Sequence, residues 1–372
     1  MMLSPFQQII NTMRTNVRFT TLCYLSVMVE HTDEADASAE SQVDAELYTE
    51  SFLKQLPRAV KRRRKEDRGF RRRLENRWRR PFELFEGVLL LGLQLGGEFN
   101  QEEGDEADGN EDFLFCALTR LHARSCLLCS EVLALLQSGH ASGAHGRWRT
   151  LHETAVTAWF ISKGDQSLAE KYLAHQGVKD LEDAEQYQKD CAKLNTEAIP
   201  EPHMEVLRHR RDHLAEVYGS AFTGKSGWAA DAVRAKFPEL KGTTINFNHV
   251  EQAAEQSHMR SLYRFASHSV HPTSKGLFYD IGLIRQQEVL LSGPSNYGLA
   301  EPANASCRSL HQATSALLMT NPNRQRFASL IAMQNLIKLT SDAFIETEQQ
   351  IVREDSEVPT ATFRTFGSNP TR

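Results

Sequence analysis

The sequence lacks any apolar run long enough to cross a membrane as a helix. Its best run, Gly87 to Gly96, covers about half of the roughly 20 residues that a membrane-spanning helix needs. Near the N-terminus, Thr20 to Val29 is only moderately apolar, and charged Glu30 and Asp33 follow it without a small-residue cleavage site. We therefore expect a cytoplasmic protein without a membrane partner.

Cysteine is also scarce, with six residues scattered over a chain of 372. This scatter does not suggest a disulfide framework. Cys126 and Cys129 form a Cys-x-x-Cys, but no second ligand pair stands at the spacing of a structural zinc site. The pair lies within a helical apolar pattern, whereas a redox motif would open a helix. We predict two small core residues, no metal and no cofactor.

No charge of one sign dominates, since the net charge is only -5. This small value argues against a protein that coats nucleic acid with its whole surface, although it permits a local basic patch. The phosphate-binding glycine loops and nucleophile motifs of common enzymes are missing as well. Hydrophobic residues make up 40% and charged residues 24% of the chain, which is ordinary for a globular protein.

A local basic patch does occur between Lys54 and Arg80. Within it Phe70, Leu74 and Trp78 recur every four residues, which predicts one stripe on a helix. Arginine suits phosphate oxygens and aromatic rings can stack on bases, so RNA or DNA is a possible partner. A protein partner, a solvated face or an anionic membrane surface are the alternatives. The predicted nucleic-acid contacts are Arg62, Arg63, Arg64, Arg71, Arg72 and Arg73.

Two features predict boundaries beyond this basic helix. Pro81 should end or kink it, and Gly96 to Asp112 is so rich in acids and glycine that we expect a solvated loop. The first 30 residues read as helix. The predicted organisation is an N-terminal helical region over residues 1–96 with the basic helix at 54–80, an acidic loop over 97–112, a helical core domain over 113–350 and a flexible tail over 351–372.

The core domain reads as helical almost throughout. The fold class is therefore all-α, a helical bundle with an N-terminal helical extension, and β content should be minor, near residues 275–283 or 289–291. The helices that the apolar pattern predicts cover residues 113–136, 144–163, 166–195, 203–218, 249–269, 307–319 and 324–352.

Two of these helical segments carry residues that suit chemistry. Arg149 and Glu153 share one face of an otherwise apolar helix, where charges usually need partners. Arg264, His268 and His271 stand at helical spacing or just past a helix end. These five residues form the candidate catalytic site.

The same segments resemble a bacterial family of domains of unknown function. The resemblance rests on the apolar helix that ends at Ser138-Gly139, on Arg149-x-x-x-Glu153 and on Tyr263-Arg264-x-x-Ser267-x-x-Val270-His271-Pro272. The similar region covers residues 113–278, and its outer limit is residue 344. The helical core of that family is similar to the HEPN domains (higher eukaryotes and prokaryotes nucleotide-binding).

Many HEPN proteins are metal-independent ribonucleases of toxin and phage-defence systems, and they often build their site across a homodimer. Their signature is an arginine followed, after four to six residues, by a histidine, and Arg264 and His271 have six between them. The resemblance therefore implies that His271 is the acid/base, Arg264 holds the phosphate, and Glu153 with Arg149 orients them. This sequence departs from the HEPN pattern at Phe265, where HEPN proteins usually have a polar residue directly after the arginine.

A short motif of this kind also arises by chance. Arg147/His152 and Arg208/His213, each with four residues between, match the same signature elsewhere in the chain.

The alternative function is that of a non-catalytic helical interaction or regulatory protein. In that interpretation Arg264 pairs with Glu153 inside the bundle, Arg149 joins this ionic network, and His271-Pro272 merely stops a helix. Exposure separates the two hypotheses, because a site needs Arg264 and His271 accessible whereas an ionic network encloses them.

Overall fold

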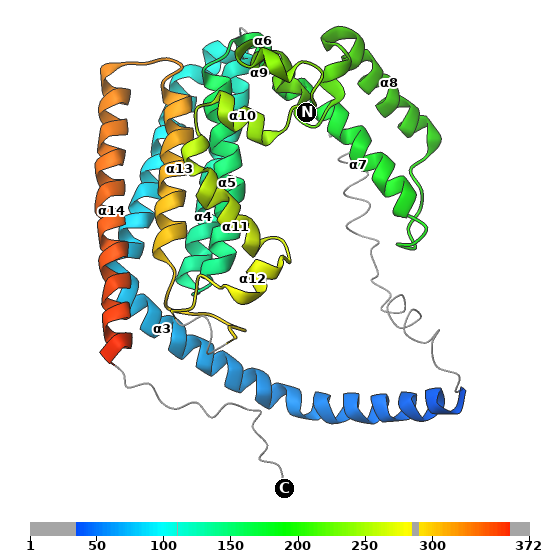
Figure 1. The fold of residues 1–372 in the computed structure, drawn as a ribbon, viewed down its shortest axis with the longest axis vertical. Coiled ribbons are helices and arrows are strands. Elements are labelled where there is room, and N and C mark those ends of the chain that lie inside the picture. Colours follow the sequence, from blue (N-terminus) through cyan, green and yellow to red (C-terminus); the bar gives the residue numbers. More distant parts are fainter. Residues whose placement is uncertain (1–34, 110, 285–289, 358–372) are drawn as a thin grey trace. The chain divides into compact units, whose positions relative to one another are not determined.

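The computed structural model describes residues 35–109, 111–284 and 290–357, and Figure 1 shows that these ranges are built from helices. The predicted all-α fold is confirmed. The predicted β content is wrong for the described residues, because none of them forms a strand and residues 274–278 form the short helix α12 (Ser274–Phe278). The helix predicted for the first 30 residues lies outside the described residues.

The chain divides into two compact units that alternate along the sequence. One unit consists of Met1–Phe70 with Gly164–Val250, and the other of Arg71–Lys163 with Glu251–Arg372. Helix α3 (Ala35–Gly109) passes from the first unit into the second. This division differs from the predicted boundary in the acidic stretch, and it places both segments of the candidate site in the second unit.

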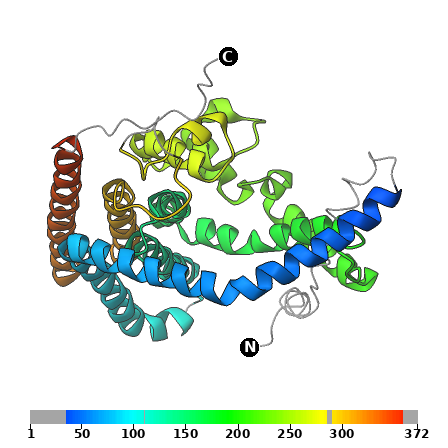
Figure 2. The ribbon, with the colours of Figure 1, turned by 90° about the horizontal axis from the view of Figure 1, so that it is seen from below.

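The second unit is a helical bundle. Figures 1 and 2 show the C-terminal part of α3 beside long, roughly parallel helices. The indole of Trp78 lies 5.5 Å from the ring of Phe344, and the indole nitrogen of Trp148 donates to the Ser309 hydroxyl at 3.0 Å. These contacts join helices that are distant in sequence. The other long helices are α4 (Phe113–Gln137), α5 (Ala141–Ser162), α13 (Ala300–Leu318) and α14 (Arg324–Glu357).

Pro81 was predicted to end or kink its helix, and helix α3 does not end there. An interior proline costs a helix about 3 kcal/mol. Here Pro81 is buried, and the adjacent Trp78 and Phe82 are at most 5% exposed on the same helix. Burial of two large aromatic side chains offsets a loss of that size, so the helix continues.

The acidic stretch predicted as a loop is also helical, up to Gly109. Phe99 is buried and stacks on Phe115, with 6.1 Å between the ring centroids. The guanidinium of Arg326 on α14 pairs with Glu102 at 2.6 Å and with Glu103. Hydrogen bonding to Arg326 lowers the pKa of Glu103. A partner on a distant helix thus stabilises a sequence that locally resembles a solvated loop.

Helices α4 and α5 agree with the predicted ranges, although α5 begins three residues earlier than predicted. Cys126 and Cys129 are buried on α4, which confirms that they are core residues. Burial raises the pKa of the Cys126 thiol to about 12 and that of Cys129 well above its ordinary value. Both thiols are therefore protonated at neutral pH and are poor metal ligands or nucleophiles.

Near the C-terminus, α13 begins at Ala300, seven residues before the predicted start. Helix α14 runs to Glu357, so the predicted flexible tail is wrong for residues 351–357. The rest of that tail, residues 358–372, lies outside the described residues.

The predicted helix over residues 249–269 is wrong as a single element. It is broken after α10 (Phe247–Ala253) and resumes at α11 (Arg260–Ala266), which continues into the 3-10 turn η5 (Ser267–Ser269). Glu255 at the break has φ 60°, in the left-handed region that few residues favour. The break turns the chain so that Glu251 and Arg260 come into contact.

The first unit contains shorter helices. The predicted helix over 166–195 is two helices separated at His175, whose Nε2 lies 3.0 Å from the carbonyl oxygen of Gly224. Helices α7 and α8 pack against each other through a small apolar core, which consists of Leu181, Ala184, Ile199, Met204 and Leu207. The helices of this unit beyond α3 are α6 (Gln166–Ala174), α7 (Gln176–Asp190), α8 (Glu201–Tyr218) and α9 (Ala230–Lys236).

Candidate functional site

One side of α5 carries a row of polar and aromatic side chains that face α10, α11 and α13. His145, Trp148 and His152 recur at three- and four-residue spacing and are at most 1% exposed. Arg149 and Glu153 accompany them and remain partly accessible. The helix thus presents buried imidazoles beside two charges that reach its surface.

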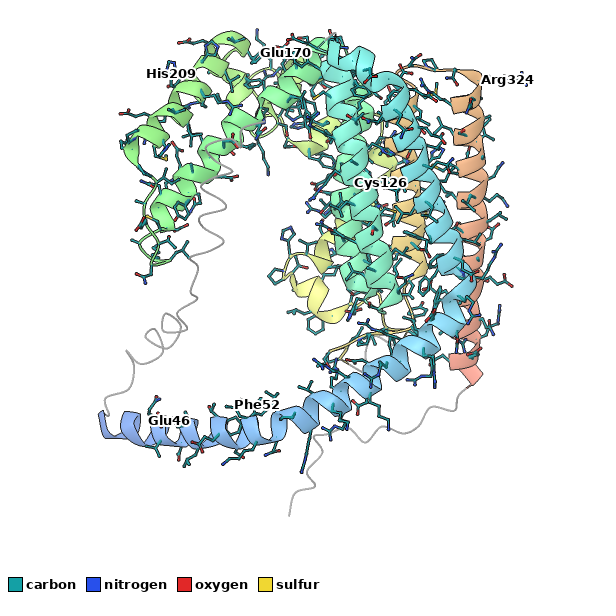
Figure 3. All side chains as sticks on the ribbon, turned by 180° about the vertical axis from the view of Figure 1, so that it is seen from behind. Glu46, Phe52, Cys126, Glu170, His209 and Arg324 are labelled. Atoms are coloured by element: carbon teal, nitrogen blue, oxygen red, sulfur yellow. The ribbon has the colours of Figure 1, made fainter. Side chains whose placement is uncertain are left out.

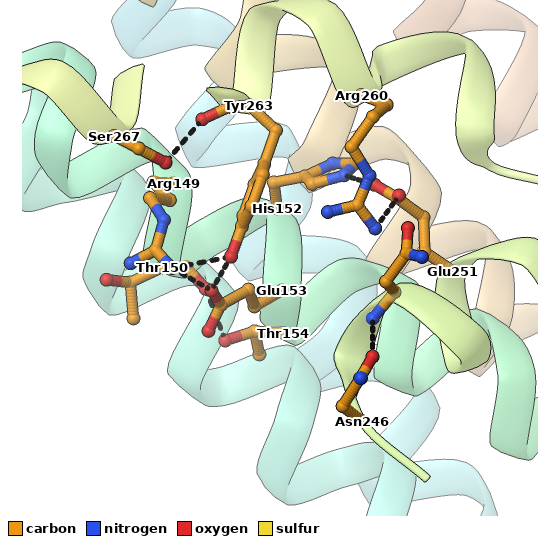
Figure 4. Close-up of polar contacts among 11 residues, drawn as sticks. Arg149, Thr150, His152, Glu153, Thr154, Asn246, Glu251, Arg260, Tyr263 and Ser267 are labelled. Carbon is orange, nitrogen blue, oxygen red and sulfur yellow. Dashed lines mark hydrogen bonds and ion pairs between the residues drawn. The ribbon is translucent and has the colours of Figure 1, made fainter. Parts of the chain in front are cut away.

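Arg149 and Glu153 form the ion pair that their spacing predicts, and Tyr263 of α11 completes a three-residue cluster (Figure 4). Arg149 Nη2 lies 3.1 Å from Glu153 Oε1 and donates to the Tyr263 hydroxyl oxygen at 2.6 Å. That hydroxyl in turn donates to Glu153 Oε1. The guanidinium carbon also lies 4.6 Å from the Tyr263 ring centroid. Burial, together with the bond to Glu153, raises the pKa of Tyr263.

A second cluster lies beside the first, around the fully buried carboxylate of Glu251 (Figure 4). His152 Nε2 lies 2.9 Å from Glu251 Oε1, and Arg260 pairs with the other carboxylate oxygen. The Tyr263 ring connects the two clusters, since its centroid lies 5.8 Å from the His152 ring and 5.1 Å from the Arg260 guanidinium. Together the clusters tie α5, α10 and α11 to one another.

Sequence reasoning did not include Glu251, Arg260 or Tyr263 in the site, and it treated His152 only as part of a chance match. A signal for Glu251 exists, because it stands among Val250, Ala253 and Ala254 on an apolar helix face. A charge in such a place needs a partner. The identity of that partner depends on the break between α10 and α11, which the helical pattern did not indicate.

The predicted catalytic residues of the second segment lie at the surface. Arg264 on α11 and His271 just after η5 are both exposed, and neither side chain has a hydrogen-bond or ion-pair partner within the described ranges. His268 is half-buried, and its Nδ1 lies 2.8 Å from the Thr273 hydroxyl. The contact of Arg264 with Glu153, expected for an enclosed ionic network, does not form, because Glu153 binds Arg149 and Tyr263 instead.

The other two arginine–histidine matches have different surroundings. Arg147 pairs with Glu131, and His152 is buried against Glu251. Arg208 on α8 holds Glu201, with 2.6 Å between Nη1 and Oε1.

Phe265 anchors the exposed segment to the bundle. Its ring lies 6.1 Å from that of His145 and 4.8 Å from that of Tyr279. His145 Nε2 in turn lies 3.2 Å from Glu301 Oε1, and burial lowers the pKa of His145 to about 4. The apolar residue that departs from the HEPN pattern therefore packs on a neutral imidazole, and it fixes the position of its neighbour Arg264.

The six arginines predicted to contact nucleic acid all lie on α3 and are exposed, namely Arg62, Arg63, Arg64, Arg71, Arg72 and Arg73. One of them, Arg63, pairs with Asp67 one turn later, with 3.0 Å between Nε and Oδ1. Their contact with nucleic acid stays a prediction.

Across the part of the chain that the structure describes, every helix is too short or too polar to cross a membrane. Within the same residues, His, Cys, Asp and Glu side chains do not gather in groups of three that could hold a metal ion.

One family model matches the chain, over residues 115–288, and it describes a family of unknown function (DUF5677). The match covers slightly less than half of the chain, and it includes α5, α10 and α11 with both polar clusters. It agrees with the predicted resemblance to an uncharacterised domain family, whereas the relation to HEPN domains stays a prediction. No curated protein matches the chain, and no solved structure does.

Proposed function

We propose that this protein is an HEPN-like, metal-independent ribonuclease, with its site at Arg264, His268 and His271. The observation that carries the proposal is the exposure of Arg264 and His271. The two competing motif matches each contain an arginine held by a nearby glutamate, Glu131 or Glu201. Among the described residues Arg264 has no ion-pair partner, and its guanidinium fork suits the oxygens of a phosphate.

The chemistry requires two proton transfers around one phosphodiester. The ribose 2′-oxygen attacks phosphorus as its proton leaves to a base, and the 5′-oxygen departs with a proton from an acid. His271 and His268 supply imidazoles for these steps, since an imidazole side chain can act both as a base and as an acid. Thr273 fixes the His268 ring through Nδ1. Arg264 stabilises the charge that develops on the phosphate oxygens.

The roles of Arg149 and Glu153 in this proposal differ from the initial prediction. They contact Tyr263, the neighbour of Arg264, and neither Arg264 nor His271. We therefore treat Arg149, Glu153 and Tyr263 as positioning residues that hold α11 against α5.

Purified full-length protein and total RNA, incubated in EDTA, test the proposal. Wild type should produce discrete RNA fragments, while Arg264→Ala and His271→Ala should slow cleavage by about 10²-fold or more. His213→Ala is the matched control, because His213 is an exposed histidine that follows Arg208 after four residues and so also fits the signature, and it should cleave like wild type. Expression in a bacterial host should arrest growth with wild type and not with His271→Ala, which would support a toxin or phage-defence role.

The non-catalytic alternative keeps one specific observation in its favour. His152, Glu251, Arg260, Tyr263 and their neighbours form mutually paired clusters of the kind that serve packing alone. Two results together would favour this function and reject the ribonuclease. RNA would stay intact with wild type and with every variant, and the bacterial host would grow at its normal rate when it expresses wild type.

A further inference from the structure

Residues 41–65 of α3 form a helical segment that leaves apolar side chains in solvent. Phe52, labelled in Figure 3, is 52% exposed, and Tyr48 is 75% exposed. Helices in proteins are held mainly by packing of an apolar face, and Pro57 removes one backbone hydrogen bond from this segment. A helix with such an exposed apolar face is stabilised when a partner buries that face. The apolar row consists of Tyr48, Phe52, Leu53, Leu56 and Val60.

Four of the five residues of this apolar row are symmetric about residue 54, and the exception is Leu53, whose mirror position is Gln55. Tyr48 and Val60 are equally far from that residue on either side, and so are Phe52 and Leu56. These four residues follow one another every four positions and therefore lie on one side of the helix. Two identical helices that run in opposite directions would place Tyr48 opposite Val60 and Phe52 opposite Leu56.

The charges of the segment are arranged in two halves of opposite sign. Residues 41–53 contain Asp44, Glu46 and Glu50 and no basic residue. Residues 54–65 contain no acidic residue, and their basic residues are Lys54, Arg58, Lys61, Arg62, Arg63, Arg64 and Lys65. An antiparallel second copy would bring each acidic half against a basic half, whereas a parallel copy would oppose like charges.

We propose that residues 41–65 of α3 pair with the same segment of a second copy of this chain, antiparallel, about a two-fold axis near residue 54. At 100° per residue, Asp44 and Glu46 lie at the two edges of the apolar row. Arg62 and Arg64 lie at the same two edges on the other side of the axis. Each copy therefore sets two acidic side chains beside two arginines of the other copy.

RNA is the partner that competes with a second copy of the chain for the same arginines. RNA would account for the basic half but not for the apolar row, and the acidic half would repel its phosphates. A second copy accounts for all three features at once, so it is the occupant that the segment favours. The proposal is independent of the ribonuclease function.

The mass of the full-length protein in solution, measured by light scattering and sedimentation over a range of concentrations, tests the proposal. Wild type should be a dimer. Asp44→Arg/Glu46→Arg and Arg62→Glu/Arg64→Glu should each raise the dissociation constant roughly a hundredfold, because attractive pairs become repulsive ones. The four changes combined in one chain should restore the dimer, as should an equimolar mixture of the two double variants.

Lys54→Glu/Lys61→Glu is the matched control, because it makes the same charge change on the opposite side of the helix and should alter the constant less than tenfold. Phe52→Ser should give a monomer with an unchanged thermal melt of the bundle. A monomeric wild type would overturn the proposal, and so would a dimer that the edge variants leave intact. Loss of binding to a single-stranded RNA probe by Arg62→Glu/Arg64→Glu, without a change in mass, would assign the arginines to RNA instead.

Discussion

Removal of the Glu251 carboxylate should destabilise the protein more than any other change in the polar clusters. Glu251 has no exposed side-chain surface, and it holds both His152, at 2.9 Å, and Arg260. Loss of one member of a buried ionic group typically costs 3–5 kcal/mol, because the remaining partners stay buried without their counterion. Arg260 is 26% exposed and can turn toward water. We therefore expect Glu251→Ala to cost about 3 kcal/mol, at the lower end of this range.

Urea unfolding followed by tryptophan fluorescence measures this loss close to the change. The Trp148 ring lies 5.5 Å from the His152 ring, so it reports on the same cluster. Glu251→Gln keeps the volume and one acceptor and should cost only about 1–2 kcal/mol. Gln252→Ala, at the exposed neighbouring position, should stay within about 0.5 kcal/mol of wild type.

A double-mutant cycle with His152→Ala separates the pair from general damage. The two losses should fall short of additive by about 1–3 kcal/mol, since the residues are in direct contact. A loss below about 1 kcal/mol for Glu251→Ala, or additive losses in the cycle, would refute the description of Glu251 as the centre of a buried ionic cluster.

Further predictions concern the exposed residues Arg264 and His271, the helical acidic end of α3 and the dependence of stability on pH. Arg264→Ala and His271→Ala should each change the free energy of unfolding by less than about 0.5 kcal/mol, since both side chains are exposed; a thermal melt checks this. Gly96→Ala would place a Cβ 2.4 Å from the buried His122 ring and should cost about 1–3 kcal/mol of stability. The Cβ of Gly97→Ala would meet no atom within 4 Å, so this change should stabilise the helix by about 0.5–1 kcal/mol. Equal effects of the two changes in urea unfolding would contradict helical packing at this end of α3. Burial lowers the pKa of His122 to about 4. The unfolded chain then binds more protons at this histidine than the folded one between about pH 6.5 and pH 4, so His122 should contribute a loss of roughly 3 kcal/mol as the pH drops through this window. His122→Gln should remove this share of the slope in urea titrations, and the share of His145, whose pKa is also about 4, should remain.

Much of the fold followed from local pattern. Apolar residues at helical spacing predicted α4, α5 and α8 closely, and Ser138-Gly139 marked the end of α4. Wherever one helix face is apolar along its length, burial of that face decides the structure. The same reasoning indicated that Arg149 and Glu153, charged residues on such a face, would be paired, as they are.

Other features depended on contacts between residues far apart in sequence. The acidic end of α3 resembles a loop until Arg326, more than two hundred residues later, neutralises Glu102 and Glu103. The pairing of Glu251 with His152 likewise arises only after the chain breaks between α10 and α11. The sequence alone determined most of the helical segments of the bundle and which charges require partners, because both follow from local spacing and from the cost of desolvation. Only the tertiary structure decided which charges meet and which stay exposed, because that depends on how the helices pack.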